Sequence, residues 1–222
     1  MSQLPEWIPI NHVHEKPRRE ILKLAITWDA RFKDLTPDEH IETYARELLE
    51  FAGTYLRNLV GNTFTFPDVF DVTISPRPRH GAGGNEIALS YASLKEGANG
   101  DEARQDVERS LLIHELVHQY DPESERLAMM VELVYVLEKG RMERLQTLKR
   151  IFTENRLESK YQDGLQFIAD ALEMDTIENF LDHATPGDAE RLKSVFVREM
   201  REVIKTTQKK NTSTLRVDNA KG

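Results

Sequence analysis

The sequence predicts an α+β protein in which a small N-terminal sheet packs on one long helix and a helical C-terminal half follows. Three short stretches near the N-terminus are β-branched or alternate between apolar and polar residues, at 21–28, 69–74 and 85–91. From about residue 102 onward, long helical patterns are separated by Gly and Pro. This order of elements is consistent with one α+β domain.

The individual elements follow from local signals. Thr36 is the expected N-cap of the first helix, with Pro37 at its first position and Glu39 closing a capping box, and Gly61 ends it after Val60. The Pro- and Gly-rich segment 75–84 is expected to be a loop, and we expect its His80 to be solvated. Further helices are predicted at 102–120, 123–139, 141–155, 161–173, 176–183 and 186–204.

We expect one domain over residues 21–205, an N-terminal arm over residues 1–20 and a disordered tail over residues 206–222. The net charge of −8 argues against nucleic acid and anionic membranes as partners. The absence of cysteine excludes disulfides, thiolate metal sites and cysteine nucleophiles. The chain has neither a secretory signal nor an apolar stretch of membrane-spanning length, so we expect a cytoplasmic location, with signal-free export left open.

The most informative stretch is an H-E-x-x-H motif within the predicted helix 102–120. His114 and His118 lie one turn apart on one helical face, so both imidazoles can reach one zinc ion. Glu115 leans toward the same side, where it can take a proton from a water molecule. The motif therefore predicts Zn2+ as cofactor and metal-assisted hydrolysis of an amide, which is the chemistry of a zinc metallopeptidase.

A catalytic zinc site needs three protein ligands, and the spacing leaves the third one open. Glu125 and Glu138 lie 7 and 20 residues after His118. Glu125 can fold back across a tight helical hairpin, whereas a hairpin would carry Glu138 well beyond the level of His114.

The segment from Leu89-Ser90-Tyr91 through a Gly-containing turn to the motif and Asp121 resembles the zincin family of Mlc titration factor A and the anthrax lethal factor catalytic domain. These proteins share H-E-x-x-H followed by Asp three residues after the second His. Their third ligand is a Glu in a helical E-F-F-A-type motif, which resembles Gln166-Phe167-Ile168-Ala169 here. The resemblance covers about residues 86–175 and implies a zincin-like fold of the gluzincin type.

The resemblance also implies roles for further residues. Gln166 falls at the ligand position, where its neutral amide oxygen is a poorer zinc donor than a carboxylate. Asp170 is expected either to orient His114 from outside the ligand set or to replace the missing ligand, and Asp121 to act from outside the ligand set. As in H-E-x-x-H enzymes, residues Glu86, Ile87, Ala88, Leu89 and Ser90 are expected to form the sheet edge that pairs with the substrate. Tyr161 is out of step with the tyrosine of the family, so its oxyanion role is not implied by the resemblance; Tyr91 and Tyr161 are oxyanion candidates as nearby tyrosines.

Three functions therefore stay open at the level of sequence. The first is a zinc peptidase that acts on a peptide or protein substrate, with Glu115 as general base. The second is a catalytically impaired zincin-fold protein that acts as a binding or regulatory module, favoured by Gln166 at the ligand position. The third is a metal-free helical adaptor with an accidental motif.

Overall fold

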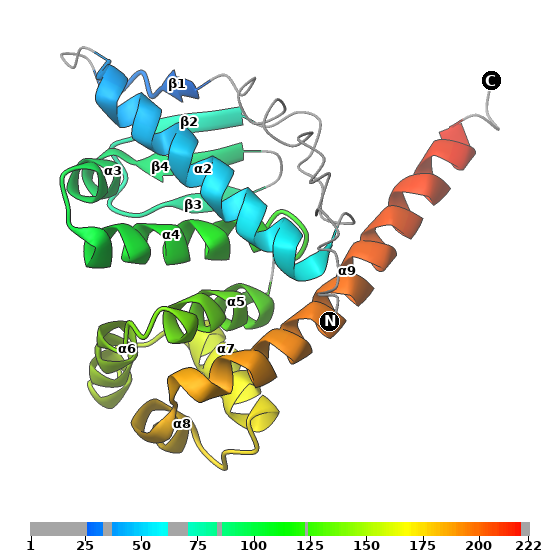
Figure 1. Ribbon diagram of the computed structural model, residues 1–222. Helices are drawn as coiled ribbons and strands as arrows, with labels where there is room; N and C mark the ends of the chain where they lie inside the picture. Colours follow the sequence, from blue (N-terminus) through cyan, green and yellow to red (C-terminus); the bar gives the residue numbers. More distant parts are fainter. Residues whose placement is uncertain (1–25, 33–36, 62–70, 84–85, 123, 219–222) are drawn as a thin grey trace, which may run out of the picture.

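The computed structural model describes residues 26–32, 37–61, 71–83, 86–122 and 124–218 (Figure 1). Within these ranges the chain forms a four-stranded sheet and eight α-helices, so the predicted α+β class is confirmed. The sheet and its covering helices make one half of the structure, and the helices that follow α4 make the other half (Figure 1).

The sheet has the strand order β1-β2-β4-β3. Strands β1, β2 and β4 are parallel to one another, and β3 is antiparallel to β4. The three predicted strands are present within the described residues, and β3 is additional: β1 (Ile26–Trp28), β2 (Asp71–Ser75), β3 (Gly81–Gly83) and β4 (Glu86–Ser90).

Strand β4 is an inner strand, contrary to the expectation that residues 86–90 form the edge of the sheet. Its residues 86–88 pair with β3 on one side and with β2 on the other, and residues 89 and 90 continue the pairing with β2. The difference arises because part of the predicted loop 75–84 turns back and adds the short antiparallel strand β3. Among the described strands, β3 and β1 are the edges of the sheet.

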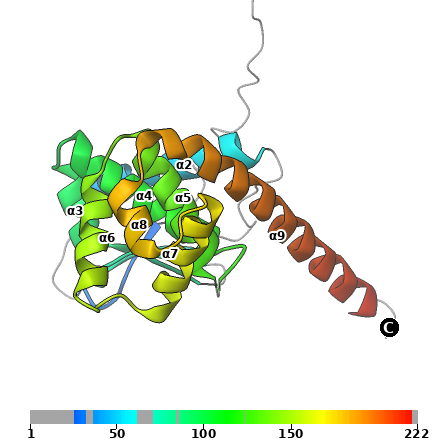
Figure 2. The same ribbon diagram turned by 90° about the horizontal axis from the view of Figure 1, so that it is seen from below.

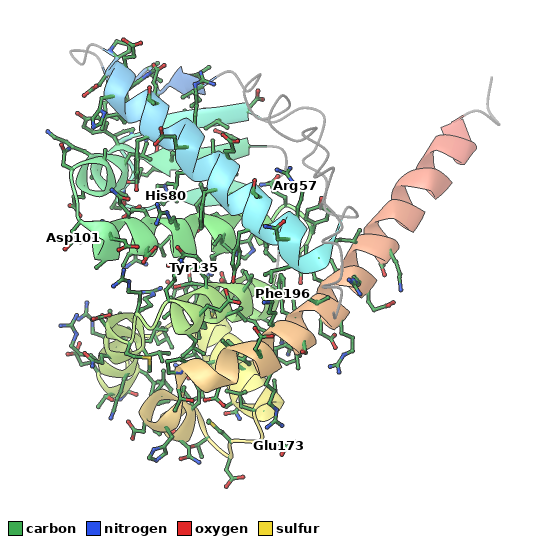
Figure 3. The ribbon with its side chains drawn as sticks, viewed as in Figure 1. Arg57, His80, Asp101, Tyr135, Glu173 and Phe196 are labelled. Atoms are coloured by element: carbon green, nitrogen blue, oxygen red, sulfur yellow. The ribbon has the colours of Figure 1, made fainter. Side chains whose placement is uncertain are left out.

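His80 is buried, so the expectation of a solvated loop histidine is wrong. Its Nδ1 accepts the backbone N–H of Ser90 at 3.0 Å, and its Nε2 lies 2.8 Å from Oε2 of Glu108 on α4 (Glu102–Val117). Figure 3 shows His80 between the sheet and this helix. The imidazole thus joins the end of β4 to the helix that carries the H-E-x-x-H motif.

Helix α2 (Glu39–Val60) crosses the sheet and contacts α4 (Figure 1). Its N-cap is Asp38, whose side chain accepts the backbone N–H of His40, whereas the predicted cap Thr36 lies outside the described residues. The helix ends at Gly61 as predicted, with a φ of 90° that L side chains rarely adopt. One face is buried at helical spacing: Ile41, Ala45, Leu48, Leu49, Ala52, Leu56 and Val60.

Helices α4 and α5 (Glu125–Glu138) form a helical hairpin at the centre of the molecule. Asp101 caps α4 and Ser124 caps α5, each accepting a backbone N–H with its side chain. His118 is the C-cap of α4, so the helix ends three residues earlier than predicted and a turn leads to α5. Nearly every residue of α5 is buried, because α4, α7 and α9 contact it.

The remaining helices complete the predicted helical half: α7 and α9 pack on α5, while α8 packs on α6 and α7 (Figure 2). They are α6 (Glu143–Thr153), α7 (Ser159–Ala171), α8 (Ile177–His183) and α9 (Ala189–Asp218), with α3 (Tyr91–Ala98) beside the sheet and a 3-10 turn at Pro186–Asp188 before α9. Helix α9 extends away from the other helices and continues through residues expected to be disordered from 206 onward, which contain neither Gly nor Pro up to residue 218. No helix in the described part of the chain is both long and apolar enough to cross a membrane.

Candidate metal centre

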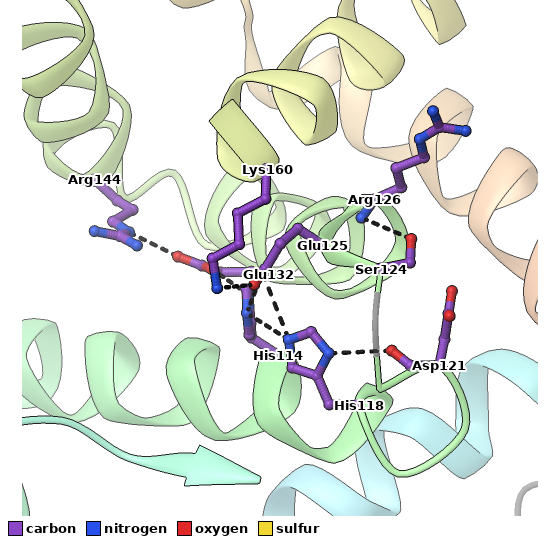
Figure 4. A network of polar contacts seen from close by, with 9 residues as sticks. All are labelled: His114, His118, Asp121, Ser124, Glu125, Arg126, Glu132, Arg144 and Lys160. Atoms are coloured by element: carbon purple, nitrogen blue, oxygen red, sulfur yellow. Dashed lines mark hydrogen bonds and ion pairs between the residues drawn. The ribbon is translucent and has the colours of Figure 1, made fainter. Parts of the chain in front are cut away.

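Three side chains from the α4–α5 hairpin converge at one point (Figure 4). His114 and His118 come from consecutive turns at the end of α4, and Glu125 is the first residue of α5. Oε2 of Glu125 lies 3.1 Å from Nε2 of His114 and 3.5 Å from Nε2 of His118, and the two Nε2 atoms are 3.2 Å apart. Such a group of three donor atoms is a candidate ligand set for a metal ion.

The three residues are buried, with 6%, 8% and 7% of their surfaces exposed. Burying polar side chains without partners is costly, so each must be satisfied by a hydrogen bond, an ion pair or a metal ion. The contacts behind the imidazoles show which of their atoms are already satisfied.

Both histidines are held from behind through their Nδ1 atoms. Nδ1 of His114 lies 2.9 Å from Oε2 of Glu132, and Nδ1 of His118 lies 3.1 Å from the backbone oxygen of Asp121. A carboxylate and a carbonyl can only accept, so each Nδ1 donates, and in a neutral imidazole each Nε2 then presents a lone pair. Fixing the tautomer through the far nitrogen is the usual arrangement of metal-binding histidines.

Glu132 is itself fixed in place within α5. It is 3% exposed, and its second oxygen accepts a 2.7 Å hydrogen bond from Nε of Arg144 on α6. Burial raises the pKa of Glu132, but Arg144 and His114 together outweigh burial and lower it, so the carboxyl is ionised at neutral pH. The chain from Arg144 through Glu132 to His114 therefore positions one imidazole.

The centre of the cluster attracts positive charge. Oε2 of Glu125 is buried and has no hydrogen-bond partner among the described residues, although both Nε2 atoms lie within ion-pair distance. Three lone-pair atoms this close repel one another unless a cation lies between them. Burial lowers the pKa of His114, yet its bonds to Glu125 and Glu132 raise it above the ordinary value. The site therefore favours a proton or a metal ion.

The donor set fits zinc. Two imidazole nitrogens and one carboxylate oxygen form the His2Glu set of catalytic zinc sites, which leave a further position open. The outer contacts of both histidines satisfy the second requirement of such a site, since each Nδ1 has an acceptor. Figure 4 shows that all of these groups lie on or next to the α4–α5 hairpin.

Lys160 at the start of α7 contacts Glu125 from the side away from α4. Its Nζ lies 2.8 Å from Oε1 of Glu125 and 4.6 Å from the ring centroid of Tyr161. Burial raises the pKa of Glu125, but the ion-pair contacts with both histidines and the hydrogen bond from Lys160 outweigh it and lower the pKa well below its usual value. Glu125 is therefore a carboxylate, and its two oxygens have different partners.

The two predicted acids of the motif region, Glu115 and Asp121, lie in different surroundings. Glu115 is half-buried beside His114, and its side chain has no hydrogen bond or ion pair with a described residue. Asp121 contacts His118 through its backbone oxygen, so the expected role of its carboxylate is taken by the main chain.

The structure does not bring Gln166 or Asp170 to the histidines in the way that the resemblance implied. The Gln166 amide donates to Asp170 at 2.8 Å on the exposed side of α7. The position expected for Gln166 is occupied by Glu125, and the orienting role expected for Asp170 is occupied by Glu132. The reason is that α7 packs on α5 near Gly164, on the side of the helix with the buried residues, whereas Gln166 and Asp170 lie on another side.

The other candidates lie at different distances from the cluster. Tyr91 packs in an aromatic group with Trp28 and Phe32, whereas Tyr161 is half-buried next to Lys160. Glu138, the alternative ligand at the longer spacing, bonds to Tyr55 and Lys193 at the far end of α5.

Sequence reasoning gave no role to Glu132, Arg144 or Lys160. One signal was present for Glu132, because it is a single acid within the otherwise apolar run from Leu127 to Leu137. A charged residue inside a buried helix needs a partner, so such a residue usually belongs to a functional or structural network of polar side chains. Arg144 and Lys160 lie in stretches rich in polar and charged residues, where a further charge carries no comparable signal.

Comparison of the chain with protein-family models, with curated proteins and with solved structures found no match. The geometry of the cluster is therefore the basis for assigning a function.

Proposed function

We propose that the chain is a zinc-dependent peptidase that hydrolyses peptide bonds. His114, His118 and Glu125 hold the zinc ion. The observation that carries this proposal is the convergence of their three donor atoms within 3.5 Å, with both Nδ1 atoms fixed from behind. A bound zinc ion would polarise the substrate carbonyl and lower the pKa of a water molecule to about 7.

Glu115 is the general base and then the general acid. Its carboxylate takes the proton from the attacking water and delivers it to the nitrogen of the departing amine. This role requires an acid that is next to the ligands and is not held by another group. Two observations support Glu115 in this role: its charge raises the pKa of His114, and it pairs with no described residue.

The sheet supports a binding mode for an extended substrate. Strand β3 contacts α4 and is an edge of the sheet, so its outer side can pair with a peptide backbone by strand addition. This replaces β4 in the role expected from sequence.

The alternative function, a catalytically impaired module, was favoured by Gln166 at the expected ligand position. A carboxylate from Glu125 at the histidines removes that reason, since a charged third ligand is then available. The peptidase is therefore the function that the site supports best.

The test compares Glu115→Gln with the wild type in zinc content and in hydrolysis of unfolded protein and peptide mixtures. We expect the variant to keep its zinc and to lose at least about 100-fold in rate, because only the base is removed. Glu178→Gln, an exposed acid on α8, is the matched control and should hydrolyse as the wild type does. Unchanged activity in Glu115→Gln would refute the mechanism.

A further inference from the structure

The two oxygens of Glu125 are divided between the metal centre and a lysine. Oε2 faces His114 and His118, while Oε1 accepts a charge-assisted hydrogen bond from Lys160 at 2.8 Å. About half of the Lys160 side chain is exposed, so the ammonium reaches the buried carboxylate from the solvent side. Figure 4 shows Lys160 approaching Glu125 from α7, away from α4.

The packing of α7 on α5 holds the lysine in this place. Gly164 follows Lys160 by one turn, and a Cβ there would lie 2.7 Å from Sδ of Met129 and 3.4 Å from the backbone oxygen of Glu125. The absence of a side chain therefore lets the first turn of α7 approach Glu125. The ring of Tyr161 lies 4.6 Å from Nζ of Lys160 and stabilises the ammonium further.

This arrangement has a consequence for metal coordination. A carboxylate can bind a cation through one oxygen or through both. A hydrogen bond from an ammonium to one oxygen competes with the cation for that oxygen. With Oε1 engaged by Lys160, only Oε2 is left for the ion, and the protein supplies three donor atoms instead of four.

We propose that Lys160 is a positioning residue that keeps Glu125 monodentate and so leaves one coordination position for water and substrate. This inference rests on the proposed function, because it requires that the cluster binds a metal ion. It adds a residue outside the ligand set that controls how many donor atoms the ion receives.

The test uses cobalt, which replaces zinc in such sites and reports its coordination through its visible absorption. Four-coordinate Co2+ absorbs several-fold more strongly than five-coordinate Co2+, so the two states are distinguishable. The full-length wild type, Lys160→Met and Lys160→Arg are stripped of metal, loaded with Co2+ and compared. Lys149→Met is the matched control, since Lys149 is equally exposed and pairs with Asp182 on α8 instead of with Glu125.

We expect an intense four-coordinate band in the wild type and in Lys149→Met, a several-fold weaker band in Lys160→Met, and recovery of the intense band in Lys160→Arg. Metal content should stay near one ion per chain in all four proteins. Equal bands in the wild type and Lys160→Met would overturn the role of Lys160 and leave the peptidase proposal intact. Absence of Co2+ and Zn2+ uptake by the wild type would overturn both.

Discussion

Replacing Glu132 with Gln should weaken zinc binding although Glu132 is not one of the three ligands. Gln has nearly the same shape as Glu, so the buried helix α5 needs no repacking. The substitution removes the negative charge that accepts from Nδ1 of His114 at 2.9 Å and from Nε of Arg144 at 2.7 Å. The Gln amide has only one oxygen, so it cannot accept from both donors in the same way.

The expected magnitude follows from these two contacts. Loss of an outer partner of a metal-binding histidine typically costs 10- to 100-fold in affinity, or about 1.4–2.8 kcal/mol. The metal-free protein should also lose stability, because Arg144 is left without its carboxylate. Breaking a fully buried pair costs about 3–5 kcal/mol, and we expect about 1–3 kcal/mol here because a quarter of the Arg144 side chain is exposed.

Competition for zinc with a chromophoric chelator measures the affinity, and urea unfolding of the metal-free protein measures the stability. Glu138→Gln is the control, because Glu138 lies on the same helix and bonds to Tyr55 and Lys193 instead of to a histidine. It should bind zinc as the wild type does. Wild-type zinc affinity in Glu132→Gln would refute the account of how His114 is oriented.

The remaining predictions concern stability. Burial raises the pKa of Asp106, but hydrogen bonds from Tyr135, Arg141 and Arg109 outweigh it and lower the pKa. The ionised carboxylate therefore adds to the free energy of unfolding above its ordinary pKa of 3.8, and this contribution is lost as the pH falls below that value. Asp106→Asn should therefore be about 1–3 kcal/mol less stable at neutral pH, and urea unfolding should show the difference narrowing below about pH 4; a constant difference would contradict this. Gly164→Ala should lower the midpoint of thermal unfolding, because the added methyl group overpacks against Met129 at a cost of about 1–3 kcal/mol. Gly187→Ala is the control, since its Cβ would meet nothing closer than 3.4 Å, and its midpoint should equal that of the wild type. A wild-type midpoint in Gly164→Ala would show that α7 does not need the close approach.

The helices and the first part of the site were predictable because their signals are local. The H-E-x-x-H spacing places His114 and His118 on one face of any helix, so their proximity needed no tertiary information. The stop of α2 at Gly61 and the order of the later helices likewise followed from nearby residues. The inner position of β4 was not predictable, since it depends on the three residues of β3 pairing back on it.

The proposed third ligand could not be chosen from sequence because its position depends on a turn. Glu125 reaches the histidines only because α4 ends at His118 and the chain reverses within a few residues. Sequence left Glu125 open as an alternative and preferred Gln166 on the basis of a resemblance. In the structure α7 turns a different side toward α5, and Gln166 bonds to Asp170 one turn further along its own helix. Which side of a helix faces its neighbour is set by many side chains together and not by a motif.

The most direct test of the account is the zinc content of the purified wild type, Glu125→Ala and Gln166→Ala, measured by elemental analysis after dialysis. We predict about one zinc per chain in the wild type and in Gln166→Ala, and a large loss in Glu125→Ala, because Glu125 is the acid that shares the site with His114 and His118 among the residues that the structure describes. Zinc retained by Glu125→Ala and lost from Gln166→Ala would contradict the ligand set on which the proposed function rests.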